Sequence, residues 1–267
     1  MPGIADSKCI LVIGATAGIG RALALSLLAL PSKPTVIVSG RRRSRLDELA
    51  KEGLEVVHCD VDADRDTLDK FVSIVLDKYP QLDSVVFSAG IQHEFDFTHP
   101  ETVDLDAFTS EINTNYIAIV TMIKYFLPHL LRKGSKGQPC FIIPVSSQLG
   151  ILPAPWVPCY AATKAALHSY TISLEAQMRG TNVNVIEIAP PLVESELHDH
   201  QGKSPSLSKM WMPLDKFTEH IMKGLLRGDS FITAGSGEKF FSRFEEGKAE
   251  AAYDSYQRMK GVWAEAK

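Results

Sequence analysis

Short apolar segments alternate with longer segments of helical periodicity along almost the whole sequence, and this alternation restricts the fold more than any other feature. The apolar segments span residues 8–14, 35–40, 54–60, 82–90, 139–147 and 183–190. Strands separated by helices pair in parallel, and a parallel sheet covered on both faces has continuously apolar strands. The pattern predicts an α/β protein with a doubly wound parallel sheet and helices on both faces.

The alternation shows no internal repeat, low-complexity tract or long linker in the 267 residues. We therefore predict a single domain over residues 1–267, with an insertion over about residues 190–215 that contributes to a substrate site. Two long helices are expected, over about residues 106–132 and 158–178. A last strand is expected within residues 229–235, followed by an amphipathic helical segment at the C-terminus.

Composition and charge exclude several classes of protein. Hydrophobic residues make up 45% and charged residues 22%, as in ordinary globular proteins. A net charge of −4 gives no electrostatic case for nucleic acid or an anionic membrane as partner. Glycines and Arg21 interrupt the apolar stretch of residues 10–30, which fits neither a signal peptide nor a membrane span. The four cysteines form no CxxC pair, and we expect reduced core thiols in a cytoplasmic protein.

A glycine-rich turn, GATAGIG, follows the first predicted strand. Glycines permit a sharp turn and a close approach of backbone to ligand, and the N–H groups that begin the next helix suit a pyrophosphate. A plain tight turn between strand and helix is the alternative. The predicted cofactor contacts of this turn are Gly14, Thr16, Ala17, Gly18, Ile19 and Gly20.

The end of the second predicted strand indicates which nicotinamide cofactor is bound. An acidic residue there would bind a ribose 2′-hydroxyl, but this chain has Gly40 followed by Arg41, Arg42 and Arg43. Guanidinium groups bind phosphate with several donors in one plane. We therefore expect NADPH or NADP⁺, with contacts from Arg41 and Arg42. The alternative is a solvated basic start to a surface helix.

Two further strand ends are expected to contact the cofactor. Asp60 and Val61 follow the third strand and could hold an adenine, although an aspartate there is also typical of a turn or a helix cap. Ala89 and Gly90 follow the fourth strand, and their small size would let a cofactor lie against the backbone.

The segment YAATK places Tyr160 and Lys164 on one face of a predicted helix, because residues i and i+4 are neighbours there. A free phenol has a pKa of about 10, and a nearby cation favours its ionised form. Tyr160 could then exchange a proton with a substrate oxygen, and Lys164 could also bind a ribose hydroxyl. Ser146 and Ser147, at the end of the preceding strand, supply a second hydrogen-bond donor. An ordinary surface pair is the alternative.

Together these motifs resemble the short-chain dehydrogenase/reductase family over about residues 8–233. The resemblance rests on the glycine turn, the Tyr160–Lys164 pair and Ser147, which stands thirteen residues before the tyrosine. It implies a Rossmann-like sheet of about seven strands, a nicotinamide cofactor and catalytic roles for Ser147, Tyr160 and Lys164. It also implies a fourth catalytic residue, Asn115, with Asn113 as the second choice.

The chain departs from the family pattern at two places. The fourth strand ends in FSAG where the family has NNAG, and a second proline, Pro191, stands where the family has glycine. By position, Pro190, Val193 and Ser195 are implied as cofactor contacts. The double proline also resembles a subgroup of carbonyl reductases similar to fungal benzil reductases and sepiapterin reductases.

Segments after the carboxyl ends of the strands should form the substrate pocket. Its apolar character predicts a hydrophobic ketone, aldehyde or diketone as substrate, although each of these residues could equally belong to the core. We expect no metal at the His-Asp-His segment 198–200, because it has no evident third ligand. His93 is a further candidate for the pocket. The predicted pocket residues are Ile91, Leu149, Leu152, Trp156, Trp211 and Met212.

The function predicted from these residues is NADPH-dependent reduction of a ketone, aldehyde or diketone to an alcohol, with Tyr160 as acid and base. The alternative is a catalytically silent NADP(H)-binding sensor or scaffold. Such proteins usually have damaged motifs, whereas this chain keeps the glycines and the Tyr–Lys pair. The resemblance further implies a homodimer or homotetramer that assembles through the two long helices.

Overall fold

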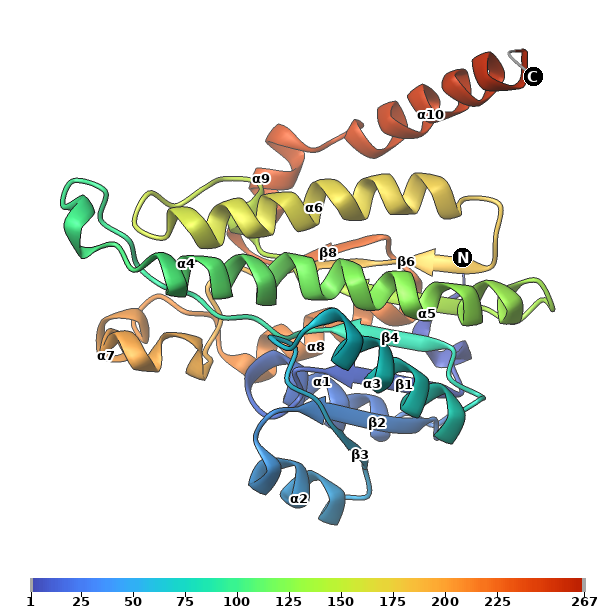
Figure 1. Ribbon diagram of the computed structural model, residues 1–267, viewed down its shortest axis with the longest axis horizontal. Helices are drawn as coiled ribbons and strands as arrows, with labels where there is room; N and C mark the ends of the chain where they lie inside the picture. Colours follow the sequence, from blue (N-terminus) through green and yellow to red (C-terminus); the bar gives the residue numbers. More distant parts are fainter. Residues whose placement is uncertain (1, 266–267) are drawn as a thin grey trace.

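A parallel sheet of six strands forms the centre of the protein, whose computed structural model describes residues 2–265 (Figure 1). The strand order is β3-β2-β1-β4-β5-β6. The chain thus winds outward from β1 in both directions, which confirms the doubly wound fold. The strands are β1 (Cys9–Ile13), β2 (Thr35–Gly40), β3 (Glu55–His58), β4 (Ser84–Phe87), β5 (Cys140–Pro144) and β6 (Val183–Val185).

Two further strands extend this sheet. β7 (Glu187–Ala189) pairs in parallel with β8 (Phe231–Thr233). A single residue, Ile186, separates β6 from β7, and its N–H donates to Ile142 O of β5 at 3.0 Å. Ile188 of β7 forms a bridge with Val145, the residue that directly follows β5. β6 and β7 therefore run as one interrupted strand beside β5. With β8 this gives the expected seven-stranded layer.

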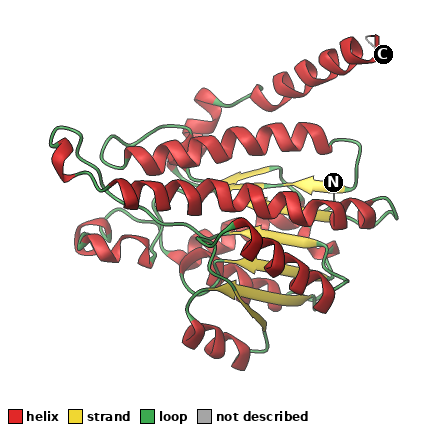
Figure 2. Cartoon of the chain, in the orientation of Figure 1, coloured by secondary structure: helices red, strands yellow, loops and turns green. Residues whose placement is uncertain are grey.

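Helices cover both faces of the sheet (Figure 2). α1, α2 and α8 pack on one face, and α3, α5 and α6 on the other. The helices are α1 (Gly18–Leu28), α2 (Arg43–Lys51), α3 (Arg65–Lys78), α4 (Leu105–Ile112), α5 (Ala118–Gly134), α6 (Pro158–Met178), α7 (Ser204–Leu207), α8 (Leu214–Arg227), α9 (Ser236–Phe244) and α10 (Lys248–Glu265). Short 3-10 turns are η1 (Ile4–Asp6), η2 (Pro100–Thr102), η4 (Gln148–Gly150) and η5 (Glu196–Gln201).

β1 shows how the apolar strands serve both faces. Ile10 and Val12 belong to the core beneath α1 and α8, whereas Leu11 and Ile13 belong to the core beneath α3 and α5. Side chains alternate between the two faces of a strand, so a strand covered on both sides has to be apolar throughout. All five residues of β1 are buried.

The helix predicted over residues 106–132 is interrupted. α4 ends at Ile112, a π-helical segment η3 (Asn113–Ile117) follows, and α5 then continues to Gly134. A π segment inserts an extra residue into the turn and is often found at functional sites. Asn115 lies in this segment and is fully buried.

The four cysteines are free and buried, as the prediction of reduced core thiols requires. Burial raises the pKa of Cys9, Cys59 and Cys159 to about 12 and that of Cys140 to about 11. The thiols therefore remain protonated at neutral pH. Among residues 2–265, no helix combines the length and the apolar character needed to cross a bilayer.

A buried histidine of α6 joins the C-terminal segment to the sheet. His168 Nδ1 lies 2.9 Å from the Glu187 carboxylate on β7, and its Nε2 lies 3.0 Å from Glu245 Oε2, just after α9. Burial opposes the charged imidazole, but the two carboxylates outweigh this effect and raise the pKa of His168.

We therefore expect His168 to make stability depend on pH. A raised folded-state pKa stabilises the fold below the ordinary histidine pKa of about 6.5, and this contribution is lost as pH rises through the folded-state value. The melting temperature should fall by a few degrees over that range. Glu245→Gln should flatten the dependence, as measured by thermal denaturation from pH 6 to 9. An unchanged profile in the variant would contradict the assignment.

Candidate active site

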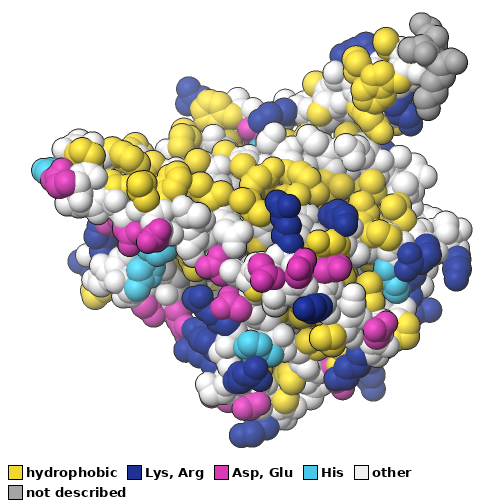
Figure 3. Space-filling view, in the orientation of Figure 1, with side chains coloured by type: hydrophobic (Ala, Val, Ile, Leu, Met, Phe, Trp, Pro, Cys, Tyr) yellow, Lys and Arg dark blue, Asp and Glu magenta, His cyan; other side chains and the backbone are white. Residues whose placement is uncertain are grey.

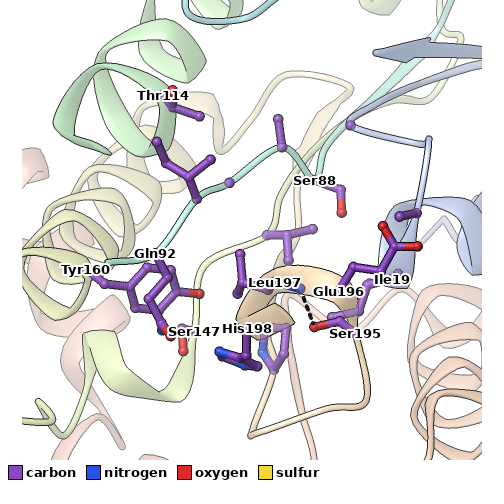
Figure 4. A pocket seen from close by; sticks show the side chains of 18 of the residues that line it. Ile19, Ser88, Gln92, Thr114, Ser147, Tyr160, Ser195, Glu196, Leu197 and His198 are labelled. Atoms are coloured by element: carbon purple, nitrogen blue, oxygen red, sulfur yellow. Dashed lines mark hydrogen bonds between the residues drawn. The ribbon is translucent and has the colours of Figure 1, made fainter. Parts of the chain in front are cut away.

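A cavity of about 870 Å³ lies beyond the carboxyl ends of β1, β2, β3, β4, β5 and β7 (Figure 4). In doubly wound sheets this edge is where ligands bind, because neighbouring crossovers there leave the sheet on opposite faces. The rest of the cavity wall comes from the segment of residues 192–212, which we call the lid segment. The lid segment contains η5 and α7 and lies within the predicted insertion.

All the residues predicted to contact the cofactor line this cavity. They come from the glycine turn, the ends of β2, β3 and β4, and the segment after β7. They are Gly14, Thr16, Ala17, Gly18, Ile19, Gly20, Arg41, Arg42, Asp60, Val61, Ala89, Gly90, Pro190, Val193 and Ser195.

The glycine turn begins where β1 and β4 end side by side. Gly14 has φ of +84°, a conformation that residues with a side chain rarely adopt. A Cβ added to Gly14 would lie 2.3 Å from the backbone nitrogen of Ala89. The glycine is therefore required both by its own backbone and by the close approach of the neighbouring strand.

Two ion pairs join the lid segment to the arginines that follow β2. Arg42 Nη1 lies 2.8 Å from Glu196 Oε2, and Arg45 Nη1 lies 2.6 Å from Glu196 Oε1. Arg42 Nε also donates to Thr16 Oγ1 at 3.0 Å, and Arg45 donates to Thr16 O at 3.2 Å. The hydrogen bonds from the two arginines lower the pKa of Glu196. The sequence reasoning missed Arg45 and Glu196, because 151 residues separate them along the chain.

Asn115 lies behind the cavity wall rather than in it. Its side chain brackets one residue of the loop after β4: Asn115 Nδ2 donates to Ile91 O at 2.8 Å, and Ile91 N donates to Asn115 Oδ1 at 2.9 Å. A Cβ added to Gly90 would lie 3.3 Å from Asn115 Oδ1 and 3.6 Å from Lys164 Nζ, so both groups converge there. Asn113 instead donates to Asp62 on the surface, which favours Asn115 as the site residue.

Tyr160 and Lys164 are both buried on α6, one turn apart. Lys164 Nζ donates to Val145 O at 2.9 Å and lies 5.5 Å from the centroid of the Tyr160 ring. Burial raises the pKa of Tyr160, with a hydrogen bond from Ser147 acting in the opposite direction. Burial lowers the pKa of Lys164 to about 8. The prediction that Lys164 brings the phenol pKa down is therefore wrong for this structure, because desolvation dominates.

The two adjacent serines after β5 point in different directions. Ser146 donates to the buried Glu187 carboxylate and is part of the network around His168. Ser147 lines the cavity with Tyr160, and its Oγ accepts from Leu149 N at 3.1 Å. The structure thus separates the alternatives, because only Ser147 stands with the tyrosine at the cavity.

The substrate end of the cavity is more polar than the sequence indicated. Ile91, Leu149 and Trp156 line it as predicted, but Trp211 does not. Leu152 and Met212 are likewise not among the lining residues. Met210, one residue before Trp211, lines the cavity instead, because the lid segment turns at this point. Polar residues missed by the sequence reasoning are Gln92, His198, His200, Gln201 and Lys203.

Metal-binding residues do not gather at this cavity. Within residues 2–265, no three His, Cys, Asp or Glu side chains come close enough together to hold a metal ion. The His-Asp-His segment places His198 and His200 at the cavity, and the ring of His200 lies beside that of His93.

Comparison with known proteins agrees with this geometry. The family model described as short chain dehydrogenase matches residues 8–205. The chain is 36% identical over 256 residues to the uncharacterized oxidoreductase DltE of Bacillus subtilis, covering 95% of each protein. It is 28% identical to the NADP-dependent 3-hydroxy acid dehydrogenase of Schizosaccharomyces pombe, covering 86% of this chain and 91% of the relative.

Solved structures of dehydrogenases share this fold. One is the closed form of serine dehydrogenase complexed with NADP⁺, with a TM-score of 0.75 and 24% identity over 85% of this chain and 94% of that structure. Because the family model covers residues 8–205 and the B. subtilis relative is 36% identical, the chain belongs to the short-chain dehydrogenase/reductase family, a class of oxidoreductases. The narrower resemblance to benzil-reductase-like and sepiapterin-reductase-like proteins stays a prediction.

Proposed function

We propose that the protein reduces a ketone, aldehyde or diketone to an alcohol with NADPH. The observation that carries the proposal is that Tyr160 and Ser147 face the same cavity as the glycine turn and the arginines after β2. In Figure 4, Tyr160 and Ser147 lie toward one end of this cavity, and Ile19 and Ser195 toward the other. The second group would hold the cofactor, and the first would meet the substrate.

The protein groups have separate tasks in the proposed reaction. The nicotinamide, when bound, supplies the hydride that the carbonyl carbon accepts. Tyr160 donates its phenolic proton to the carbonyl oxygen, and its raised pKa keeps that proton available at neutral pH. Ser147 donates a hydrogen bond to the same oxygen. Lys164 would bind the ribose, while Asn115 holds the loop after β4 in place.

The proposed preference for NADPH rests on Arg42, with Arg41 beside it at the cavity. Arg42 contacts the glycine turn through Thr16, and its guanidinium group forms an ion pair with the Glu196 carboxylate. A 2′-phosphate could bind the same guanidinium group in a similar way. The S. pombe relative is named as NADP-dependent, which supports this assignment.

We expect Arg42→Ala to raise KM for NADPH roughly 10-fold or more, with KM for NADH changed less than about 2-fold, because only NADPH carries the 2′-phosphate. Initial rates with both cofactors measure this. Arg43→Ala is the matched control, since Arg43 is also exposed but does not line the cavity. Equal effects of the two substitutions, or a wild-type preference for NADH, would contradict the proposed cofactor.

Loss of NADPH absorbance with a panel of ketones, aldehydes and diketones tests the reaction itself. The alternative is a silent NADP(H)-binding sensor or scaffold, which would bind NADPH tightly and reduce nothing. The presence of all four proposed catalytic residues in the arrangement described above favours the enzyme.

We further propose that the chain works as a single-domain subunit of a homodimer or homotetramer in the cytoplasm. Hydrophobic side chains gather over α5 and α6 on the face shown in Figure 3. Ile117 of η3 and Leu131 of α5 are 39% and 36% exposed, and the rings of Tyr116 of η3 and Tyr170 of α6 pack edge to face. Burial of this surface in a subunit contact would remove apolar area from water.

A further inference from the structure

Three imidazoles line the cavity. His93 belongs to the loop after β4, and His198 and His200 belong to η5 of the lid segment. The ring centroids of His93 and His200 lie 5.5 Å apart. We call these three residues the imidazole cluster. In Figure 4, His198 lies toward the same end of the cavity as Tyr160, Ser147 and Gln92.

His93 is held in a defined orientation by a buried carboxylate. Its Nδ1 lies 2.8 Å from Glu111 Oε2, and its backbone N–H donates to the same oxygen at 2.8 Å. Glu111 is fully buried on α4. A carboxylate oxygen accepts a hydrogen bond from Nδ1–H, so Nε2 is left for another group, to which it donates when the imidazole is charged. Within the described chain, Nε2 makes no hydrogen bond. Glu111 would also stabilise the charged imidazole if an anion approached.

The carboxylates around the cavity are already paired or lie elsewhere. Glu94 forms an ion pair with Lys203, and Glu196 binds the arginines after β2. Asp60 lies at the end of β3, in the predicted adenine region. No other carboxylate lines the described cavity. The side chains that line the cavity without a negative charge include the imidazole cluster and Gln92, and each of these can donate a hydrogen bond from nitrogen.

We propose that the natural substrate is an oxo acid, whose carboxylate binds the imidazole cluster while its carbonyl group meets Tyr160 and Ser147. The inference rests on the proposed function and narrows its substrate class. A carboxylate presents two acceptor oxygens in one plane, and the neighbouring rings of His93 and His200 come from two elements, the loop after β4 and the lid segment. Binding the carboxylate would therefore also hold the lid segment to the loop after β4. A neutral diketone would offer these groups only an uncharged carbonyl oxygen, which makes weaker hydrogen bonds than a carboxylate.

The test compares a 3-oxo acid with its methyl ester, which keeps the same carbon chain and carbonyl but lacks the charge. With NADPH, the wild-type kcat/KM for the acid should exceed that for the ester by roughly 10-fold or more, since hydrogen bonds to a charged group are stronger than neutral ones. His93→Asn retains a donor near the position of Nδ1, so Glu111 stays paired, but it removes Nε2. This variant should raise KM for the acid roughly 10-fold and leave the ester within about 2-fold.

His99→Asn is the matched control, because His99 lies on the exposed loop before η2 and does not line the cavity. Similar kcat/KM for acid and ester in an active wild type would overturn the oxo-acid assignment and leave the reductase intact. So would equal losses on both substrates in His93→Asn. If neither the 3-oxo acid nor its ester is reduced, the proposed reduction is wrong for these compounds. Thermal stabilisation of the NADPH complex by the acid, lost in His93→Asn, would still support the anion site, and its absence would overturn it.

Discussion

Tyr160→Phe is expected to lower kcat about 1,000-fold, while Kd for NADPH changes less than about 2-fold. The substitution removes only the hydroxyl that would donate a proton to the substrate oxygen. Ser147 and the bound cofactor remain in the variant, so a small residual rate should persist. Cofactor affinity should be preserved because the glycine turn and the arginines after β2 are untouched. Steady-state loss of NADPH absorbance gives kcat, and titration of NADPH fluorescence gives Kd.

Tyr170→Phe is the control for this experiment. Tyr170 lies on the same helix, is half-buried, and packs on Tyr116 away from the cavity. It should retain wild-type turnover. A Tyr160→Phe enzyme with kcat near that of Tyr170→Phe would show that another group donates the proton.

Gly14→Ala is expected to destabilise the fold by about 3 kcal/mol or more and to abolish NADPH binding. The new Cβ would lie 2.3 Å from Ala89 N and 2.6 Å from Ala89 Cα, both backbone atoms that cannot rotate away. The ends of β1 and β4 would have to separate, and the turn expected to hold the pyrophosphate lies between them. For a chain of this size we expect the melting temperature to fall by roughly 6–12 °C.

Gly53→Ala separates the two causes of that loss. Gly53 has φ of +94°, close to the +84° of Gly14, but an added Cβ would meet nothing within 4 Å. In this control the free energy of unfolding should fall by only about 1 kcal/mol, the cost of placing alanine in a left-handed backbone. NADPH binding should be kept. Equal destabilisation of the two variants would mean that the contact with Ala89 has no effect of its own.

Glu196 gives the proposed cofactor preference a structural consequence. Its carboxylate binds Arg42 and Arg45 and so joins the lid segment to the segment after β2. A 2′-phosphate at Arg42 would compete with this carboxylate for the same guanidinium group. Under the proposed function, cofactor binding and the position of the lid segment are therefore coupled through one side chain.

The strands, helices and glycine turn could be predicted from the sequence because each depends on residues close together in the chain. Continuous apolar segments fix the strands, and helical periodicity fixes their crossovers. Tyr160 and Lys164 share a face through the geometry of one helical turn. The sequence motifs also selected Ser147, which the structure places at the cavity with Tyr160.

Only the tertiary structure decided the features that depend on burial or on distant segments meeting. Burial reversed the expected direction of the Tyr160 pKa. The turn of the lid segment brought Met210 to the cavity instead of Trp211. The ion pairs of Glu196 and the imidazole cluster join segments about one hundred or more residues apart. No local pattern encodes such contacts, because they form only when separate loops are brought to one edge of the sheet.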